Sequence, residues 1–372
     1  MEYYDVIIIG AGIAGCGLAY NLKRIDYKGS VLVIDKNEVG SNIGYGYRNT
    51  FKEIIEDYDL PYAYRYKGVH LGTFDKICIT LNVDFYLVDY NKICNYLLNK
   101  SDFYFKREIG VDLQNNILTT DKSQYKFRYL IDCAGHKSFL RKLFKKREPI
   151  LYYLGDVGIF ENKSRKTSKF FTFLSDDKGF IEDFYLLKDK VISGYWQISK
   201  KIDFSLIKPP DNTLRLKHSK NNSRISQAKI ILPSSPILPL SYRNYAFLGD
   251  SFGNATPIAA EGVRPILRAS EILAESIKKN NLIMYDKTWR KKYLNQYIKY
   301  ISMRFDPILR DKLVRAINPK IHHDVCVSIL RGDEVRIPKE MMKNIPMKMM
   351  AKQLFFNSSL KLKYLLTSNM SN

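Results

Sequence analysis

The feature that most constrains this chain is the stretch 5–35, which reads DVIIIGAGIAGCGLAYNLKRIDYKGSVLVID. Residues 6–9 are apolar and β-branched, which is typical of a buried parallel strand, and a GxGxxG turn follows directly from Gly10 to Gly15. Apolar residues at helical spacing come next, and a second buried strand, 31–34, ends at Asp35. Strand, glycine-rich turn, helix, strand and acid in this order predict a βαβ unit that binds a dinucleotide.

Each position of this motif has a physical role. The first glycine permits a tight turn, the second lets a pyrophosphate approach the backbone, and the third lets the helix pack close to the strand. The first N–H groups of the helix attract phosphates, and the terminal acid accepts hydrogen bonds from ribose hydroxyls. The alternative is a glycine-rich turn in an α/β fold that binds nothing. The predicted cofactor-binding residues here are Gly10, Gly12, Ile13, Ala14, Gly15, Asp35 and Lys36.

A second motif, GDSFGNATPIAAEGV, occupies residues 249–263. Its aspartate ends a short strand and can accept hydrogen bonds from the ribityl hydroxyls of a flavin. The segment after its proline opens a helix, whose N-terminal N–H groups favour negative charge at the pyrimidine end of a reduced isoalloxazine. NAD needs no such second motif, so the two motifs together predict FAD. The predicted cofactor-binding residues here are Gly249, Asp250, Pro257, Gly262 and Val263.

The chain is strongly basic, with a formal charge of +22 over 372 residues. Residues 286–372 contain 18 Lys and Arg against 7 Asp and Glu. Three explanations stay open: a lysine-rich compositional bias, an anionic membrane surface, and nucleic acid. Nucleic acid is not favoured, because the sequence contains no recognised nucleic-acid module. The acid-free tail after Glu340 mixes Met, Phe and Leu with Lys, which suits a docked amphipathic helix or a helix on an anionic membrane.

The sequence predicts a cytoplasmic protein, with or without peripheral membrane association. No apolar run reaches the roughly 18–20 residues that cross a bilayer, and residues 1–9 do not form a signal peptide. The five cysteines are odd in number and scattered, with no CxxC pair. Neither a disulfide framework nor a metal site is therefore expected.

The pattern of strands and helices predicts an α/β fold with a Rossmann-like FAD-binding domain, an antiparallel β-sheet substrate domain and a helical C-terminal region. The FAD-binding domain is expected to be discontinuous, from residues 1–65, 90–150 and 240–280. The substrate-binding sheet is expected at 66–89 and 151–239, and the basic helical region at 281–372.

Aromatic residues are frequent in the predicted substrate sheet, between residues 148 and 198. Such side chains on one face form a core or line a large apolar pocket. Tyr195 and Trp196 are candidates for the wall of that pocket. Arg48 follows a glycine-rich loop and is a candidate for a phosphate or a substrate carboxylate, the alternative being a surface arginine.

On these motifs, over about residues 1–280, the chain resembles the FAD-dependent superfamily of para-hydroxybenzoate hydroxylase type, and within it the geranylgeranyl reductases. The V-D-R element of the family appears as Val88-Asp89-Tyr90, without the arginine. The A-D-G-x-x-S element appears at 133–138 with Ala134 in place of the aspartate, and the G-E-G element begins with Ala260. The resemblance adds two predicted cofactor-binding residues, Val111, through its backbone amide at the adenine, and Gly135.

The resemblance implies a reductase that uses reduced FAD to saturate double bonds of prenyl chains. The implied substrate is a large apolar prenyl lipid, and the implied electron donor is NAD(P)H or a ferredoxin-type protein. Two family features are missing: residues 36–50 contain no cysteine, and Tyr195-Trp196-Gln197-Ile198 lacks the Phe-Pro that ends the family's substrate element. The alternatives are a flavin-dependent monooxygenase of an apolar or aromatic substrate and a basic nucleic-acid-binding flavoprotein. The sequence assigns no catalytic residue.

Overall fold

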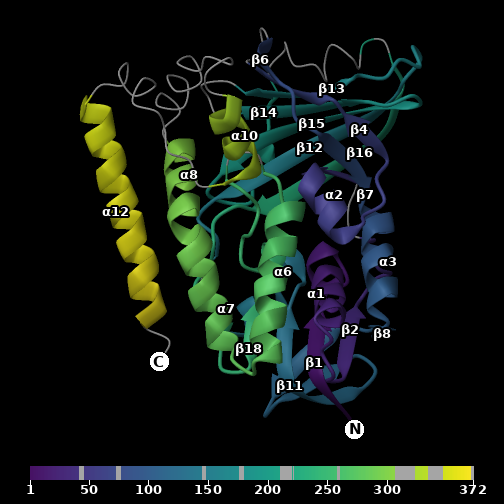
Figure 1. Ribbon diagram of the computed structural model, residues 1–372, viewed down its shortest axis with the longest axis vertical. Coiled ribbons are helices and arrows are strands. Elements are labelled where there is room, and N and C mark those ends of the chain that lie inside the picture. The colour runs from purple at the N-terminus through teal and green to yellow at the C-terminus, as the bar shows by residue number, and fades with distance from the viewer. Residues whose placement is uncertain are drawn as a thin grey trace.

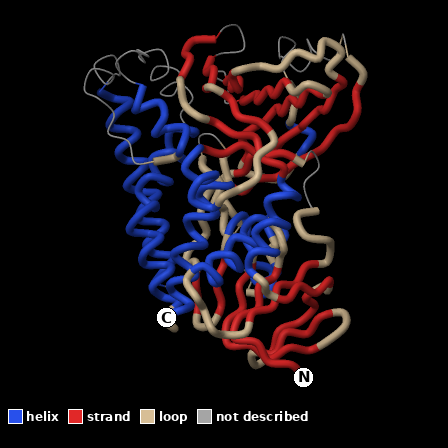
Figure 2. Tube along the Cα trace, turned by 45° about the vertical axis from the view of Figure 1, so that its right-hand side comes forward, coloured by secondary structure: helices blue, strands red, loops and turns tan. Residues whose placement is uncertain are grey.

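The computed structural model describes residues 1–41, 46–72, 77–144, 148–175, 180–209, 220, 222–257, 260–305, 323–333 and 347–369. Figure 1 shows two sheets towards opposite ends of an elongated molecule, with helices between and beside them. Figure 2 shows the same division from another side, with strands in a lower and an upper layer and most helices along one flank. The predicted α/β fold, with a second sheet and a helical C-terminal region, is confirmed.

The lower sheet, here called the nucleotide sheet, has the strand order β17-β18-β11-β1-β2-β8. Strand β1 pairs in parallel with β11 along one edge and with β2 along the other, so it lies inside the sheet. This position explains its uninterrupted apolar run, because strands of parallel sheets are covered on both faces. The strands are β1 Glu2–Ile9, β2 Val31–Asp35, β8 Tyr104–Arg107, β11 Gln124–Asp132, β17 Ser241–Tyr242 and β18 Tyr245–Phe247, with the ribbon β9 Gly110–Gln114 and β10 Ile117–Thr120 attached to β11.

Helix α1 (Ile13–Arg24) packs between α3 (Tyr90–Ser101) and α6 (Val263–Lys278) beside this sheet. The Asp89 side chain accepts a hydrogen bond from Lys92 N–H at 3.1 Å, and it caps the N-terminus of α3. The buried Asn21 amide of α1 donates to Ser270 Oγ of α6 at 2.7 Å. These contacts join the first motif to a helix that comes some 250 positions later in the chain.

The upper sheet, here called the second sheet, has the order β16-β12-β15-β14-β13-β5-β6. Its pairs are antiparallel, as predicted, except that β5 and β13 run parallel. The strands are β5 Gly68–Gly72, β6 Ile77–Leu81, β12 Tyr152–Glu161, β13 Phe170–Ser175, β14 Phe180–Leu186, β15 Lys190–Ser199 and β16 Arg224–Pro233.

A small sheet of order β3-β7-β4 lies between the two larger ones. It contains β7 (Phe85–Asp89), which the sequence places in the substrate sheet together with β5 and β6. Strand β7 instead pairs with β3 (Tyr47–Phe51) and β4 (Tyr64–Tyr66). The helix α2 (Lys52–Tyr58) follows β3 directly.

The C-terminal region is helical wherever the structure describes it. Helix α7 (Leu282–Trp289) continues through a π-helical turn into α8 (Asn295–Phe305). The ring of Trp289 lies 5.3 Å from that of Tyr297 despite this turn. The remaining helices are α4 Phe139–Leu143, α10 His323–Arg331 and α12 Met347–Asn369. None of the helices in the described ranges is both long and apolar enough to cross a bilayer.

Candidate functional site

Backbone contacts fix the glycine-rich turn between β1 and α1. Gly10 has a φ of +109°, which other residues rarely adopt, and its N–H donates to Ile34 O at 2.7 Å. A Cβ at Gly15 would lie 1.9 Å from Gly10 O. Only glycine therefore lets α1 begin this close to β1, as the motif predicts for these two positions.

Tyr90 places its hydroxyl at the N-terminus of α1. Ile13 N–H donates to Tyr90 Oη at 2.9 Å, and a Cβ at Gly12 would lie 2.7 Å from the same oxygen. Burial raises the pKa of Tyr90 well above its usual range, so the hydroxyl keeps its proton. A hydroxyl can accept one hydrogen bond and donate another. Tyr90 can therefore link the helix terminus to a phosphate oxygen. The sequence does not reveal this role, because there Tyr90 only replaces the arginine of the V-D-R element.

The Asp35 carboxylate is oriented by two backbone groups. Ala11 N–H donates to Oδ2 at 2.8 Å, and Asn37 N–H donates to Oδ1 at 2.9 Å. Each carboxylate oxygen can accept a further hydrogen bond. Asp35 is thus fixed in place at the end of β2 and can still accept hydrogen bonds from a ribose. The neighbouring Lys36 side chain is exposed, and its carbonyl accepts a hydrogen bond from Arg107 Nε at 3.3 Å.

Val111 lies in the ribbon beside Asp35. Glu108 N–H donates to Asp35 O at 2.9 Å, which fixes the start of the ribbon against the end of β2. The pairing of β9 with β10 is irregular at Val111, and its side chain is exposed. Val111 therefore lies at the same end of the sheet as the predicted adenosine-binding residues.

The two motifs touch each other. Gly249 opens the 3-10 turn after β18, and a Cβ there would lie 2.8 Å from Ala14 Cβ of α1. Val263 is buried at the first position of α6, and Gly262 precedes it as the N-cap. Residues from distant parts of the chain thus form one continuous surface at the carboxyl ends of β1 and β18, where α/β sheets bind ligands.

Asp250 provides the acidic group of the second motif. Within the described ranges, no hydrogen bond or ion pair from another residue reaches its carboxyl group. Desolvation raises its pKa to about 6, and the guanidinium groups of Arg48 and Arg141 act in the opposite direction. Arg48 lies over the ring of Tyr90 at 5.7 Å. Arg48 therefore lies among the cofactor-binding candidates, whereas the sequence left open a phosphate, a substrate carboxylate or a surface position for it.

Asp132 is a functional residue that the sequence reasoning missed. Its carboxylate accepts hydrogen bonds from Ala134 N–H at 2.9 Å, Ser138 Oγ at 2.7 Å and Leu140 N–H at 2.7 Å. It fixes the loop that carries Gly135, which has a φ of +67° and open space where a Cβ would lie. The signal was present in the sequence: an aspartate ends a buried strand immediately before the altered family element.

Arg141 is a second residue that the sequence reasoning missed. Its side chain is buried and donates to His136 O at 2.5 Å and to Ser251 O at 3.2 Å. It therefore fixes the Gly135 loop to the turn that carries Asp250. No sequence motif identifies it, because its partners, two backbone carbonyls and the Glu148 carboxylate at 3.4 Å, come from separate segments.

Side chains from outside the motif position the loop before α6. Tyr297 of α8 donates to Asn254 O at 2.5 Å, and Arg304 Nε donates to Pro257 O at 3.0 Å. Tyr153 of β12 also donates its hydroxyl to Pro257 O. The second sheet and the C-terminal helices therefore meet at this loop, and together they fix the predicted flavin-binding residue Pro257.

Glu261 is a buried acid at the start of α6. Its Oε1 accepts Arg264 N–H at 2.8 Å, whereas its Oε2 has no hydrogen-bond partner among the described residues. Desolvation raises its pKa to about 8, so the carboxyl group holds a proton at neutral pH. The preceding Ala260 has a φ of +52°, which explains why the family pattern has glycine there.

The side chain of Arg264 ties α6 to two neighbouring helices. It donates to Glu53 of α2 at 3.2 Å, to Arg331 O at 2.8 Å and to Asp333 at 2.6 Å. These partners fix the helix whose N-terminus belongs to the second motif. Its guanidinium group therefore has a structural role.

The side chains of the substrate candidates Tyr195 and Trp196 do not lie in one pocket. They are consecutive residues of β15, so their side chains point to opposite faces of the sheet. Tyr195 is buried and donates to Lys208 O at 3.2 Å, and it packs with Leu174. Trp196 is buried in the larger cluster on the other face, and its Nε1 has no hydrogen-bond partner among the described residues.

This larger cluster, here called the aromatic wall, lies between the second sheet, the small sheet and α10. It includes Tyr153, which bonds to the loop before α6, and Ala260 of that loop packs against it. Of the two substrate candidates on β15, only Trp196 belongs to it. Its buried members are Phe51, Tyr66, Val69, Ile79, Leu81, Phe85, Leu87, Tyr153, Val157, Phe171, Leu187, Ile192, Trp196, Cys326, Val327 and Leu330.

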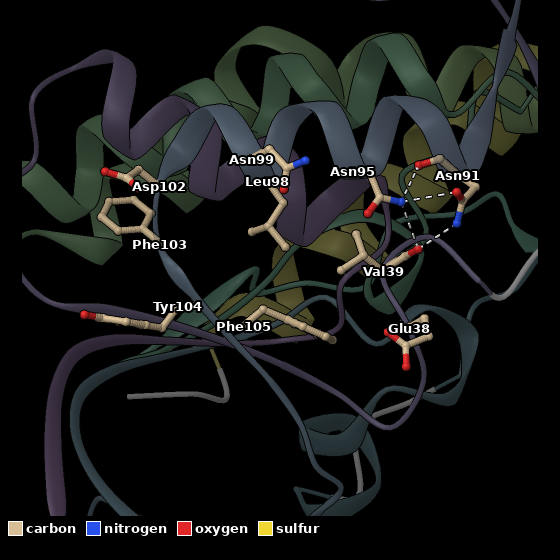
Figure 3. Close-up of a pocket in the computed structure, with 10 residues that line it drawn as sticks. All are labelled: Glu38, Val39, Asn91, Asn95, Leu98, Asn99, Asp102, Phe103, Tyr104 and Phe105. Atoms are coloured by element: carbon tan, nitrogen blue, oxygen red, sulfur yellow. Dashed lines mark hydrogen bonds between the residues drawn. The ribbon is translucent and has the colours of Figure 1, made fainter.

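A cavity of about 520 Å³ lies elsewhere, between the outer side of α3 and the edge strand β8. Figure 3 shows the amides of Asn91 and Asn95 turned towards the carbonyl of Val39. These bonds tie the loop after β2 to α3. The predicted cofactor and substrate residues do not line this cavity.

The arrangement fits FAD. The turn at Gly10–Gly15 and the Asp35 carboxylate can hold a pyrophosphate and a ribose. The unpaired Asp250 carboxyl can accept ribityl hydroxyls, and open space beside Gly135 leaves room for a ligand. The N-terminus of α6 lies at the second motif, where the pyrimidine end of the flavin is expected.

Comparison with known proteins agrees with this geometry. Residues 5–69 match the protein family described as FAD dependent oxidoreductase. No curated protein sequence matches the chain. Among solved structures, the flavin-dependent brominase Bmp2 is similar with a TM-score of 0.72 and 17% identity, over 97% of this chain and 99% of that one.

Two further structures span both kinds of chemistry that the sequence left open. A geranylgeranyl bacteriochlorophyll reductase-like protein from Thermoplasma acidophilum has a TM-score of 0.70 and 14% identity, over 95% of this chain and 100% of that one. PqsL, a probable FAD-dependent monooxygenase from Pseudomonas aeruginosa, has a TM-score of 0.60 and 15% identity, over 88% and 100%. This chain has the fold of the FAD-dependent oxidoreductases, which supports FAD as its cofactor.

Proposed function

We propose that this protein is an FAD-dependent reductase that saturates isolated double bonds in a large apolar lipid of prenyl type. The observation that carries the proposal is the aromatic wall beside the second motif. Tyr153 joins the two directly through its hydrogen bond to Pro257 O. The wall is buried in this structure, so a ligand would have to separate it from the flavin-binding loop, and the lining that the ligand would then meet is apolar over most of its area.

The residues of the chain have separate roles in this proposal. Gly10, Gly12, Gly15 and Asp35 would hold the adenosine and pyrophosphate, and Asp250 with the N-terminus of α6 would hold the flavin. NAD(P)H or a ferredoxin-type protein would supply the electrons. When bound and reduced by that donor, FADH2 would supply the hydride for the alkene and become FAD. The aromatic wall would exclude water and orient the chain of the substrate.

Glu261 is the residue best suited to hold a proton near the reacting centre. Its pKa of about 8 keeps the carboxyl group protonated at neutral pH. Its Oε2 atom has no hydrogen-bond partner among the described residues. A general acid works best when its pKa lies near the working pH. Saturation of an alkene requires one proton for each hydride, so a neutral acid beside the flavin-binding loop suits this reaction.

The test uses the purified holoprotein under anaerobic conditions. We expect a flavin absorbance spectrum, bleaching on chemical reduction, and return of the oxidised spectrum when a geranylgeranyl lipid is added. Mass spectrometry should then show a product with two hydrogen atoms added per double bond. Protein that binds FAD but leaves the lipid unchanged, with no reoxidation, would refute the reductase proposal.

A flavin-dependent monooxygenase is the second candidate. The missing Phe-Pro after Gln197 and the absence of cysteine from residues 36–50 separate this chain from many prenyl reductases. Oxygen uptake distinguishes the candidates. A monooxygenase consumes oxygen in step with NAD(P)H and adds one oxygen atom to its substrate, whereas a reductase does neither.

A further inference from the structure

Helix α12 (Met347–Asn369) forms an outer edge of the molecule. Figure 1 shows it as the element farthest to one side, standing next to α8. Its inner side is anchored, because Leu360 and Tyr364 are buried in the core of the nucleotide end. The side chain of Gln353 also donates to Ser302 Oγ of α8. The orientation of the helix is therefore fixed, and one face remains turned outwards.

Exposed apolar side chains stand on that outward face, with the exposed Ser358 and Ser359 between them. Phe355 is 78% exposed and Leu362 is 57% exposed, and they lie seven residues apart on the same stripe of the helix. Leu354, with 66% exposure, lies beside them. Single exposed apolar residues are common on protein surfaces, but a stripe on a helix that is already docked indicates a contact surface.

Lysines flank this stripe on both sides. At 100° per residue, Lys361 lies on one side of the Phe355–Leu362 line, and Lys352 and Lys363 lie on the other. All three side chains are exposed. The sequence of the helix contains four lysines and no acidic residue. Exposed apolar side chains with one lysine on one side and two on the other suit the boundary between lipid headgroups and acyl chains, because lysine stems lie along apolar surface while their ammonium groups reach phosphates.

We propose that α12 docks this protein on an anionic lipid bilayer. The helix would lie flat, with Phe355 and Leu362 inserted among the acyl chains and the lysines on the headgroups. Its 23 residues span about 34 Å at 1.5 Å per residue, which gives a long line of contact. The inference goes beyond the proposed reaction, because docking needs neither flavin nor substrate.

Charge favours the bilayer over a second copy of the chain. A symmetric dimer through this face would bring the same surface of both copies together. The lysines of the two copies would then face each other without any acid from either helix, and like charges in an interface are unfavourable. An anionic bilayer supplies the opposite charge along the whole helix.

The test measures co-sedimentation of the full-length holoprotein with vesicles. One set of vesicles is phosphatidylcholine alone, and the other contains phosphatidylglycerol at about a third of the lipid. We expect binding to the anionic vesicles and its loss at high salt. The variant Phe355→Ser with Leu362→Ser should weaken this binding about tenfold or more, because two inserted side chains are removed. The matched control, Ile225→Ser with Ile283→Ser, removes two apolar residues of 59% and 60% exposure elsewhere and should bind as the parent does.

Thermal unfolding and size-exclusion chromatography complete the test. Both double variants should keep the unfolding temperature of the parent, since the altered side chains are exposed. Equal binding of the α12 variant and the control, or no preference for anionic vesicles, would overturn the proposal. The proposal would also be overturned if the parent protein were a dimer that did not bind vesicles and the α12 variant were a monomer, because α12 would then be a contact between two copies of the chain. Flavin absorbance is followed in parallel, so failure of docking is distinct from failure of the redox proposal.

Discussion

The two motifs of the cofactor site are built in different ways. The first, at residues 10–15, is determined by contacts within its own βαβ unit, such as the approach of Gly15 to Gly10 O. The second, at residues 249–263, depends on side chains from elsewhere: Tyr153 from the second sheet, and Tyr297 and Arg304 from α8. The half of the candidate site expected to hold adenosine thus belongs to one local unit, whereas the half expected to hold the flavin joins three parts of the chain.

This difference predicts how substitutions in each of the two motifs will act. In the first motif the limiting contacts are between backbone atoms, which cannot move without displacing a strand or helix. In the second motif, one residue in a disfavoured conformation and one buried acid persist because the surroundings hold them. Changes in the first motif should therefore affect folding, and changes in the second should affect flavin binding and pH dependence.

The largest effect is expected for Gly15→Ala. Its Cβ would lie 1.9 Å from Gly10 O, and neither backbone segment can yield. We expect a loss on the order of 4 kcal/mol in the free energy of unfolding, or failure to fold. Urea denaturation checks this. Gly110→Ala is the control, because its Cβ would make only ordinary contacts of 3.6–3.8 Å and should change stability little. Equal stability of the two variants would contradict the backbone argument.

The next effect is expected for Glu261→Gln, and it depends on pH. The carboxyl group has a pKa of about 8 in the folded protein against 4.5 as its ordinary value. The folded state therefore binds one more proton than the unfolded state between these values, and the parent loses stability as the pH rises through this window. Glutamine cannot ionise and still accepts Arg264 N–H.

The variant should therefore become more stable relative to the parent from pH 5 to pH 8, by about 3 kcal/mol. Thermal unfolding across this range measures the difference. Glu56→Gln, an exposed surface change, should stay within about 0.5 kcal/mol of the parent throughout. A Glu261→Gln difference that does not change with pH would rule out a protonated Glu261.

A smaller effect is expected for Tyr297→Phe. It leaves Asn254 O without its 2.5 Å hydrogen bond, which costs about 1 kcal/mol and loosens the loop before α6. We expect FAD to dissociate about five- to tenfold more readily, as measured by flavin fluorescence. Tyr285→Phe removes a comparable buried bond, to Phe247 O at 3.0 Å, and should keep the affinity of the parent for FAD. If both variants lose FAD equally, α8 has no special role at this loop.

The smallest effect is expected for Ala260→Gly. Alanine at φ +52° costs about 1–2 kcal/mol, and glycine relieves this while adding flexibility to the unfolded chain. The net gain should be about 0.5 kcal/mol in urea denaturation. Ala255→Gly, at a buried position of the same loop without positive φ, should instead lose stability. A loss at both positions would show that the Ala260 side chain contributes more through packing than its conformation costs.

The sequence predicts the first motif well because its constraints are local. Strand, turn, helix and Asp35 appear where the pattern places them. The strand and the helix on either side of the second motif were also predictable, because Gly249 and Asp250 follow a strand directly and a helical pattern begins at Val263. The superfamily and the α/β fold with a helical C-terminal region followed from these elements.

The remaining features depend on contacts between distant segments. The roles of Arg141 and Arg304 lie in their bonds to backbone carbonyls, which leave no pattern in the sequence. Strand β7 joined the small sheet because its partner was decided by tertiary packing. The separation of Tyr195 from Trp196 was predictable, since neighbours on a strand alternate between faces. The aromatic wall, on which the proposed function rests, is assembled from distant segments that no local motif describes.

The parallel pairing of β1 has a consequence for synthesis on the ribosome. Strand β2 follows soon after, but β11 begins only at Gln124, roughly 6–23 s later at about 5–20 residues per second. A similar interval then separates β11 from β18. For that time one edge of the most apolar strand in the chain has no partner, which is the condition under which nascent chains aggregate or recruit chaperones. The cofactor site is therefore one of the last parts of this protein to be completed in the cell.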